Sequence, residues 1–309
     1  MGGPEVETRY PEPVSYGIRR CELDHYLLQR SKARVKVGAL RDLQRDRLGW
    51  VVNGEIRTPI VVGAGGHFCP VARRLGARTS GDGVVAAQEI EFLMDSRQER
   101  DCRVDPEVPE LYFCPDLKGY GWCFRKQDCL NVGFGRLDDR RFSTHVRGFL
   151  AFLHDRRRIP PDTATRWKGH AYSIYPATAR PLLDDGVVLV GDAAGLAYAE
   201  SGEGIRPAVE SGLMAARTVL LAEGSYTRES LASYQRAIEG RFGTRGKGGA
   251  PRVPAWITAL AGAAVLRTPW LTRRLVVERW FLHRHESALT WDTPAPLAST
   301  EARRTAAAH

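Results

Sequence analysis

Apolar and polar residues alternate with the period of β-strands in two stretches of the chain. Between residues 33 and 66, three apolar runs, ARVKVGAL, GWVVNG and EIRTPIVVGAGG, predict a β-meander that ends in a buried strand over 59–62. The dipeptide Asn53-Gly54 between the second and third runs is a strong signal for a tight hairpin. Between residues 83 and 136, four further runs separated by turn residues predict an antiparallel sheet.

In other stretches of the chain, the apolar residues recur with the period of an α-helix. Residues 18–30 fit a short amphipathic helix with its leucines on one side, and residues 142–155 fit a second helix. A third helix is predicted from about residue 205, with Pro207 in its first turn and Gly224 just past its end. The apolar positions at helical spacing in this third helix are Val209, Leu213, Ala216 and Leu220.

Composition and charge narrow the possible partners. Lys and Arg number 45 against 36 Asp and Glu, but the basic residues form no long run and lack interleaved aromatics. We therefore expect no nucleic-acid partner. The six cysteines include no CxxC pair, which predicts free thiols in a reducing compartment, and the histidines lack metal-ligand spacing. No apolar leader or membrane-spanning run is present, so the sequence predicts a cytoplasmic protein.

The C-terminal region leaves two interpretations open. Trp and Arg stand beside apolar residues in the segment 253–284. This pattern is typical of a helix that lies on a membrane surface, but it also fits a helical cap over an open sheet face, which we favour. The residues after about Trp291 predict a disordered tail.

The segment VVLVGDAAGLAYAESGEGI, residues 187–205, carries the strongest chemical signal. Its apolar strand ends in Gly191, which lets the backbone approach a ligand closely, and Asp192 follows where α/β sheets bind ligands. A carboxylate there can accept hydrogen bonds from sugar or ribityl hydroxyls. Gly202 and Gly204 then open a helix whose free N–H groups and dipole favour negative charge. The unit predicts a cofactor site, although a plain strand–turn–helix with a capping Asp is the alternative.

This unit resembles the second flavin motif of the p-hydroxybenzoate hydroxylase superfamily, and most of all its geranylgeranyl reductase branch. In that family the Asp at the position of Asp192 contacts the ribityl chain of FAD, and the start of the GEGI helix faces the flavin ring. The resemblance implies an FAD site that includes Gly191, Asp192, Ala193, Gly202, Gly204 and Ile205.

Two further segments agree with the resemblance. Residues 19–27 are similar to the family's R-x-x-x-D-x-x-L helix, in which the arginine, here Arg20, lies near the cofactor. GAGGHFCPVAR, residues 63–73, resembles the superfamily's G-A-D-G-x-x-S-x-V-R segment and adds Gly63 and Gly65 to the implied cofactor contacts. Gly65 stands where aromatic hydroxylases carry Asp, so their handling of NADPH is not carried over.

A larger departure concerns the start of the family's fold. The family begins with a strand, a G-x-G-x-x-G turn and a helix that hold the ADP half of FAD, and no such pattern stands upstream of Arg20. We therefore expect an incomplete FAD-binding Rossmann-like domain, and we carry over no catalytic residue.

The segment GYGWCFRK, residues 119–126, indicates a substrate surface. It resembles the Y-x-W-x-F-P signature of geranylgeranyl reductases, with Arg125 in place of the proline. On a strand, Tyr120, Trp122 and Phe124 project to one face and would form an apolar wall for a prenyl chain or a flat hydrophobic ligand. A half-buried strand that packs on a helix gives the same alternation, so both interpretations stay open.

These elements predict an α/β (α+β) fold in four parts. Residues 1–78 would form a partial FAD-binding region with the β-meander, and 79–175 an antiparallel substrate domain. Residues 176–224 would complete the flavin side of the FAD-binding domain. Residues 225–309 would form a helical C-terminal region with the disordered tail.

The leading hypothesis is an FAD-dependent oxidoreductase that reduces C=C bonds of a hydrophobic, prenyl-like substrate with an unidentified reductant. Its partners would be a small hydrophobic molecule or prenyl lipid, with peripheral membrane contact left open. A flavin-dependent monooxygenase or halogenase is the first alternative. A non-catalytic or truncated flavoprotein remnant is the second, because the G-x-G-x-x-G unit is not found.

Overall fold

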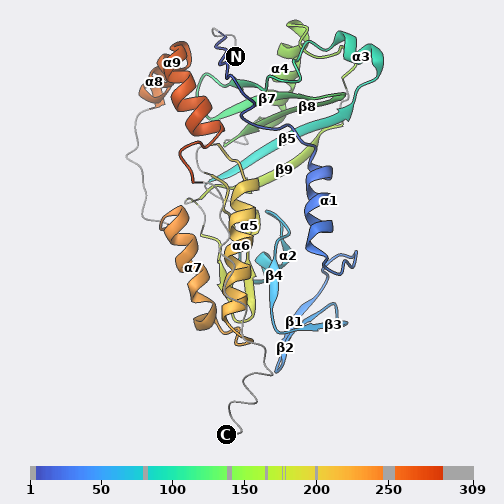
Figure 1. The fold of residues 1–309 in the computed structure, drawn as a ribbon, viewed down its shortest axis with the longest axis vertical. Helices are drawn as coiled ribbons and strands as arrows, with labels where there is room; N and C mark the ends of the chain where they lie inside the picture. The colour runs from blue at the N-terminus through green and yellow to red at the C-terminus, as the bar shows by residue number, and fades with distance from the viewer. Residues whose placement is uncertain are drawn as a thin grey trace.

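The computed structural model has a curved antiparallel sheet in one half and a smaller mixed sheet covered by helices in the other (Figure 1). It describes residues 5–78, 83–137, 141–163, 166–175, 177, 179–198, 201–245 and 255–287, with only the backbone of 255–259. The predicted C-terminal tail lies outside the described residues. All six cysteines are described, and each is a free thiol.

The larger sheet confirms the antiparallel prediction. Its five strands run in the order β6-β7-β8-β5-β9, and every neighbouring pair is antiparallel. The strands are β5 (Val84–Leu93), β6 (Glu110–Phe113), β7 (Gly119–Lys126), β8 (Cys129–Arg136) and β9 (Lys168–Ser173).

Helix α4 (Phe142–Asp155), which has the predicted bounds, covers one face of this sheet. Its buried residues Phe149 and Leu153 recur at helical spacing, as an amphipathic helix requires. Gly121 of β7 brings the strand close, because a Cβ there would lie 2.5 Å from the Phe149 ring. The short helix α3 (Ser96–Asp101) follows β5 and begins with a capping box on Asp95.

The smaller sheet has the order β10-β11-β4, with β11 and β4 parallel and β10 antiparallel to β11. Its strands are β4 (Val61–Gly63), β10 (Leu183–Asp184) and β11 (Val187–Leu189), and β11 is completely buried. The prediction of a buried strand over 59–62 was wrong in one respect. β4 lies at the sheet edge, where Val62 is 48% exposed.

The β-meander is confirmed, but its first strand lies later than predicted. The strands are β1 (Leu43–Asp46), β2 (Gly49–Val52) and β3 (Ile56–Thr58), and Asn53 and Gly54 adopt positive φ in the turn. The apolar run 33–40 forms no strand. Val37 is 95% exposed, because alternation alone does not provide a neighbouring strand with which to pair.

Helix α6 (Ile205–Leu221) forms as predicted but buries a different face. Its buried residues are Pro207, Glu210, Ser211, Ala215 and Thr218, whereas Val209 and Leu220 of the predicted apolar stripe are exposed. The helix approaches the preceding turn closely, and Ser211 Oγ accepts a 3.0 Å hydrogen bond from the Gly191 N–H. Small and hydrogen-bonding residues therefore occupy the contact, and the larger side chains point outward.

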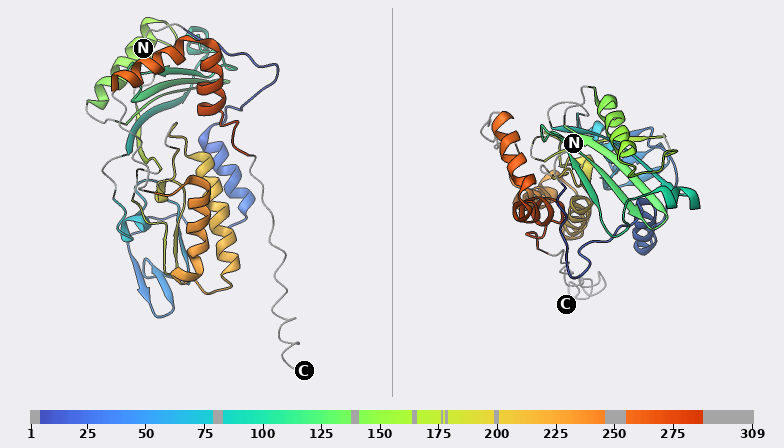
Figure 2. Two further views of the ribbon diagram at one scale, coloured as in Figure 1. Left: turned by 90° about the vertical axis from the view of Figure 1, so that its left-hand side faces the viewer. Right: turned by 90° about the horizontal axis from the view of Figure 1, so that it is seen from above.

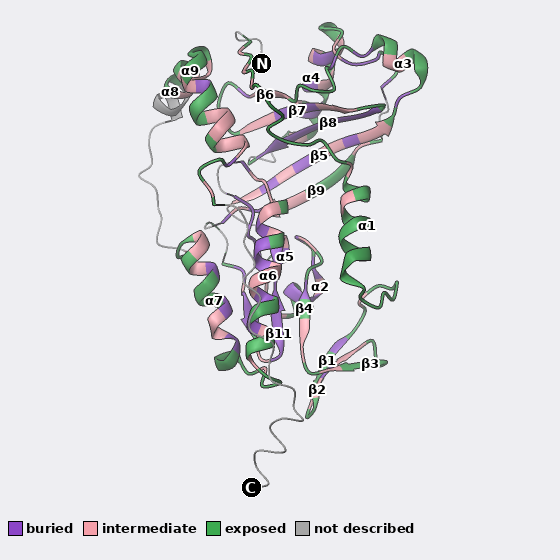
Figure 3. Ribbon diagram, viewed as in Figure 1, coloured by how far each residue is buried: buried purple, intermediate pink, exposed green. Residues whose placement is uncertain are grey.

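Helix α1 (Arg20–Ser31) also forms close to its predicted bounds, yet none of its residues is buried. Figure 3 shows it exposed along almost its whole length. The expected amphipathic packing of its leucines is therefore wrong for this structure, since Leu27 and Leu28 are exposed. The other helices are α2 (Pro70–Arg74), α5 (Gly191–Ala194), α7 (Arg228–Phe242), α8 (Ala255–Arg267), α9 (Pro269–Leu271) and the π-helix η1 (Thr272–Phe281).

The C-terminal helices α8, α9 and η1 lie beside the larger sheet (Figure 2). The Trp280 ring of η1 packs 4.9 Å from the Tyr120 ring and 5.2 Å from the Phe113 ring, centroid to centroid. This arrangement fits the helical-cap interpretation. In the described part of the chain, no helix has the length and apolar character needed to cross a bilayer.

Candidate functional site

The turn after β11 presents a carboxylate whose hydrogen bonding is incomplete. Asp192 Oδ1 is buried and has no hydrogen-bond partner among the described residues. Burial raises the pKa of Asp192, because the charged form loses water. Nearby arginine and histidine side chains oppose this rise in pKa, namely His67, Arg180, Arg20 and His170. A buried acceptor without a donor indicates a position where a ligand hydroxyl could bind.

Two arginines that the sequence did not indicate hold this turn. Arg180, which is buried, donates to the carbonyls of Asp192 at 3.1 Å and Ala193 at 3.4 Å. Arg245 donates to the carbonyl of Ala194. Both arginines come from irregular segments without a periodic pattern, so no local signal could have identified them. They fix the backbone that carries the Asp192 carboxylate.

The sequence predicts free backbone N–H groups at the start of α6, but the structure pairs one of them within the preceding loop. The Arg206 N–H donates a 2.9 Å hydrogen bond to Glu203 Oε1, so a carboxylate of the same loop caps the helix. Burial raises the pKa of Glu203, while its hydrogen bonds from the backbone oppose this rise. Glu203 Oε2 is buried without a hydrogen-bond partner among the described residues.

Gly202 and Gly204 keep this loop close to the neighbouring side chains. A Cβ on Gly204 would lie 3.0 Å from Asp192 Oδ1, so the glycine leaves the space beside that carboxylate open. A Cβ on Gly202 would lie 2.3 Å from the hydroxyl of Tyr172 on β9. Gly202 also has a φ of +69°, which side-chain-bearing residues rarely adopt. The loop therefore joins the Asp192 turn to the larger sheet.

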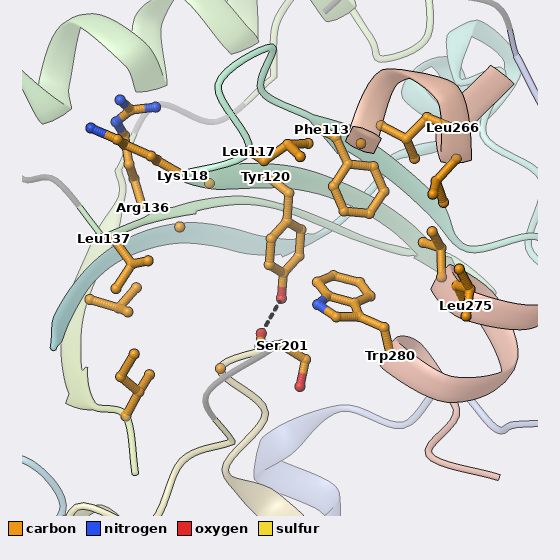
Figure 4. Close-up of a pocket in the computed structure, with 18 of the residues that line it drawn as sticks. Phe113, Leu117, Lys118, Tyr120, Arg136, Leu137, Ser201, Leu266, Leu275 and Trp280 are labelled. Carbon is orange, nitrogen blue, oxygen red and sulfur yellow. Dashed lines mark hydrogen bonds between the residues drawn. The ribbon is translucent and has the colours of Figure 1, made fainter. Parts of the chain in front are cut away.

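The three aromatic side chains predicted to share one face of β7 have different partners. The Tyr120 hydroxyl donates a 2.9 Å hydrogen bond to the Ser201 carbonyl, across the gap between sheet and loop (Figure 4). Trp122 lies against Gly133, and its Nε1–H donates to Asn131 Oδ1 at 2.7 Å. Phe124 lies near Phe281 of η1, at a centroid distance of 6.4 Å.

A polar network on the same face was missed at the level of sequence. Asn131 Nδ2 donates to Glu89 Oε2 at 3.1 Å, and Lys126 Nζ donates to Glu91 Oε2 at 2.6 Å. The two glutamates stand two residues apart on β5, and this spacing was the only signal. The network fixes the Trp122 ring through Asn131 and makes this end of the face polar.

An apolar cavity of about 320 Å³ lies between the sheet, the loop and the C-terminal helices (Figure 4). Ser201 and Gly202 line it where it meets the loop. Of the three predicted wall residues only Tyr120 lines the cavity as described, and Trp122 and Phe124 do not. The other aromatic rings in its lining, which sequence reasoning missed, are Phe113, Tyr172 and Trp280.

The C-terminal segment is attached to the loop just beyond the cavity. His283 Nε2 lies 3.2 Å from Ser201 Oγ, and the His283 ring stacks on Tyr198 at a centroid distance of 4.4 Å. The Tyr198 hydroxyl in turn accepts a 2.7 Å hydrogen bond from Arg241 of α7. The end of η1, the loop and α7 therefore form one connected cluster.

The remaining predicted cofactor residues have mainly packing neighbours. Cβ atoms on Gly63, Gly65 and Gly191 would meet Leu189, Cys69 and Ala208 respectively. Ala193 is buried in the turn, Ile205 begins α6, and Arg20 is exposed with its guanidinium paired to Asp24 at 3.2 Å. Arg20 lies near enough to Asp192 to lower its pKa. Their contact with a cofactor stays a prediction.

In its fold, this chain resembles solved structures of a reductase-like protein and of a flavin-dependent halogenase. A geranylgeranyl bacteriochlorophyll reductase-like protein from Thermoplasma acidophilum superposes with a TM-score of 0.55 at 21% identity, over 74% of this chain and 57% of that one. A flavin-dependent halogenase superposes with a TM-score of 0.51 at 18% identity, over 73% of this chain and 44% of the halogenase.

Among the sequence relatives are geranylgeranyl and digeranylgeranyl-lipid reductases. The digeranylgeranylglycerophospholipid reductase of Methanocaldococcus jannaschii is 26% identical over 76% of this chain and 63% of its own length. The chloroplastic geranylgeranyl diphosphate reductase of Oryza sativa subsp. japonica is 33% identical over 57% of this chain and 37% of its own length. The chain thus spans less than two thirds of these relatives. No family model matches it.

Proposed function

We propose that this chain binds FAD at the Asp192 turn and forms the catalytic part of an oxidoreductase that reduces C=C bonds of a prenyl-like substrate. The observation that carries the proposal is the meeting of two features at one loop. Gly204 borders the unsatisfied Asp192 carboxylate, and Gly202, two residues before it, lines the apolar cavity. A hydrophilic cofactor chain and a hydrophobic substrate would therefore meet there.

The residues of the turn fit FAD. The unpartnered Asp192 Oδ1 would accept a hydrogen bond from a ribityl hydroxyl, and the absent Cβ of Gly204 leaves room beside it. Arg180 would keep the carboxylate in place by holding the carbonyls of the turn. FAD would supply the hydride chemistry, and the chain would supply position and electrostatics. The contacts of Gly63, Gly65 and Arg20 with the cofactor belong to this proposal.

The cavity fits the substrate part of the proposal. Its lining is mostly apolar, and rings from three elements, Phe113, Tyr120 and Trp280, face it. Such a wall binds a branched hydrocarbon chain by excluding water. The named relatives act on geranylgeranyl compounds, whereas halogenases resemble this chain only in fold. The reductase is therefore favoured over the monooxygenase or halogenase alternative.

Retention of FAD is the first test of this proposal. Purified protein is incubated with excess FAD, desalted and examined for flavin absorbance. We expect bands that persist in the unaltered chain and in Asp42→Ala, a matched removal of an exposed carboxylate, and that disappear in Asp192→Ala. A chain that never retains FAD would support the remnant alternative instead.

Reduction of a prenyl substrate is the second test. The FAD-loaded protein, reduced with dithionite, is given geranylgeranyl diphosphate, and the product is analysed by mass spectrometry. We expect a gain of two hydrogens for each double bond reduced. Oxygen consumption stimulated by an aromatic compound, without alkene reduction, would favour the monooxygenase alternative.

We also propose that the C-terminal helices contact a lipid surface. Leu260 of α8 and Trp270 of α9 are exposed, and Arg267 and Arg274 stand nearby in the sequence. Other residues of α8 and η1 line the cavity, so a lipid substrate would have a short path from bilayer to cavity. Flotation with anionic liposomes should carry the protein upward, and Trp270→Ala should reduce the bound fraction. Protein that stays at the bottom at low salt would refute the contact.

A further inference from the structure

Tyr172 of β9 occupies the place where the sheet, the loop and the cavity meet. It lines the cavity, and its register partner on β5 is Val85, which lines the cavity too. Its hydroxyl would lie 2.3 Å from a Cβ on Gly202 and 3.7 Å from a Cβ on Gly135 of β8. The hydroxyl is therefore held between the loop and the sheet, at the loop end of the cavity.

The two tyrosines at this end of the cavity differ in what their hydroxyls do. The Tyr120 hydroxyl gives its proton to a hydrogen bond with the Ser201 carbonyl. The Tyr172 hydroxyl has no hydrogen-bond partner in the part of the chain that is described, so its proton is available to a ligand. Burial raises the pKa of Tyr172, and the nearby Tyr120 and Asp192 act in the same direction. The group therefore stays a neutral hydroxyl at physiological pH.

The two carboxylates nearest the loop do not line the cavity. Glu203 caps α6 through the Arg206 N–H. Asp192 lies beside Gly204 and is not among the residues that line the cavity. His67 is also absent from the lining, and its Nδ1 lies 3.1 Å from the Arg180 guanidinium, which can only donate.

We propose that Tyr172 is the catalytic residue that donates the proton in the alkene reduction. This inference rests on the function proposed above. One alkene carbon would accept a hydride from reduced FAD while the π bond breaks. The other carbon would take the proton of Tyr172, forming the second new C–H bond as the O–H bond breaks. The phenolate would then recover a proton from water, and FAD would leave the step oxidised.

The test compares Tyr172→Phe with Tyr112→Phe. The second variant removes a tyrosine hydroxyl from the same sheet, on β6, where it donates to Glu110 rather than lining the cavity. Four properties are measured for each: thermal unfolding, FAD retained after desalting, quenching of tryptophan fluorescence by geranylgeranyl diphosphate, and steady-state alkene reduction. Tyr172→Phe keeps the ring and removes only a hydroxyl that has no hydrogen-bond partner among the described residues, so it should not prevent folding.

We expect Tyr172→Phe to lower kcat for alkene reduction by about 100-fold or more, as the loss of a general acid does. KM, FAD retention and fluorescence quenching should stay within about twofold of the unaltered protein, and Tyr112→Phe should match it in all four properties. As a measurement on the unaltered chain, turnover should be slower in D₂O than in H₂O.

Two results would overturn the assignment while the proposed function stands. One is a Tyr172→Phe variant that keeps its kcat. The other is a variant whose kcat loss is accompanied by equal losses of FAD and substrate binding, which would make Tyr172 a positioning residue. An unaltered, FAD-loaded protein that reduces no alkene would instead overturn the proposed function, and this assignment with it.

Discussion

Gly202 and Tyr172 stand so close together that no side chain fits between them. A Cβ on Gly202 would lie 2.3 Å from the Tyr172 hydroxyl and 2.7 Å from its ring. The two residues are separated by 30 positions in the sequence and belong to different halves of the molecule, the larger sheet and the loop before α6. Their contact sets how closely the proposed cofactor turn approaches the sheet.

Gly202→Ala should therefore be destabilising for two reasons. The residue has a φ of +69°, which costs alanine about 1 kcal/mol, and the new methyl group would clash with Tyr172. We expect the free energy of unfolding to fall by roughly 2–3 kcal/mol in urea denaturation.

Gly54→Ala is the matched control, because Gly54 has a φ of +70° but no heavy atom within 4 Å of its Cβ position. The free energy of unfolding of Gly54→Ala should fall only by the cost of the positive φ, about 1 kcal/mol. Equal losses in the two variants would mean that the contact with Tyr172 contributes nothing.

Asp192→Asn should change stability and flavin binding in opposite directions. Burial raises the pKa of Asp192, so the folded chain holds this proton more tightly than the unfolded chain. In FAD-free protein, stability then falls as pH rises from the ordinary value of 3.8 through the raised pKa, and stays lower above it. An asparagine at this position has no charge to bury. We therefore expect the free energy of unfolding of Asp192→Asn to exceed that of the unaltered protein by roughly 1 kcal/mol at pH 7.

Thermal unfolding of the FAD-free proteins between pH 4 and pH 8 measures this difference. The variant should lie above the unaltered protein at the upper end of the range and converge with it at the lower end. Flavin absorbance after desalting should meanwhile decrease, because the carboxylate acceptor is lost. An equal decrease in stability at every pH would contradict the burial argument.

Glu210→Ala should destabilise the cluster that joins α6, α7 and the C-terminal segment. Glu210 is only 4% exposed, and it accepts hydrogen bonds from Arg206 at 2.9 Å and Arg241 at 3.2 Å. Removing it leaves two partly buried cations without their counter-charge, which should cost roughly 2–3 kcal/mol in urea denaturation. Glu229→Ala, on the exposed start of α7, should cost less than about 1 kcal/mol.

The sequence predicted the positions of helices more reliably than it predicted which side of each helix is buried. Helix α4 has the predicted bounds because Val146, Phe149 and Leu153 recur at helical spacing, and this pattern is complete within the helix itself. Helix α6 also forms where predicted. Its buried side could not be predicted, because Glu210 is stabilised there by Arg241, which comes from a distant helix.

The same distinction applies to the candidate site. Asp192 and the glycines that follow it are close in the sequence, so their type and spacing were informative. The wall of the cavity combines Phe113, Tyr172 and Trp280, from two separate strands and the C-terminal π-helix, and no local pattern joins them. Trp122, which the pattern favoured, is instead held over Gly133 by Asn131. Prediction of such a wall requires the tertiary pairing of strands and helices.

The attachment of His283 to Ser201 and Tyr198 has a kinetic consequence. It fixes the end of η1 only three residues after Trp280, whose ring covers the cavity. We therefore expect the covering helices to open from their α8 end, with the junction between α8 and α9 at Thr268 and Pro269 as the hinge. We expect a long ligand to enter and leave at that end, so that product release, rather than the chemical step, limits turnover when the hinge is stiffened.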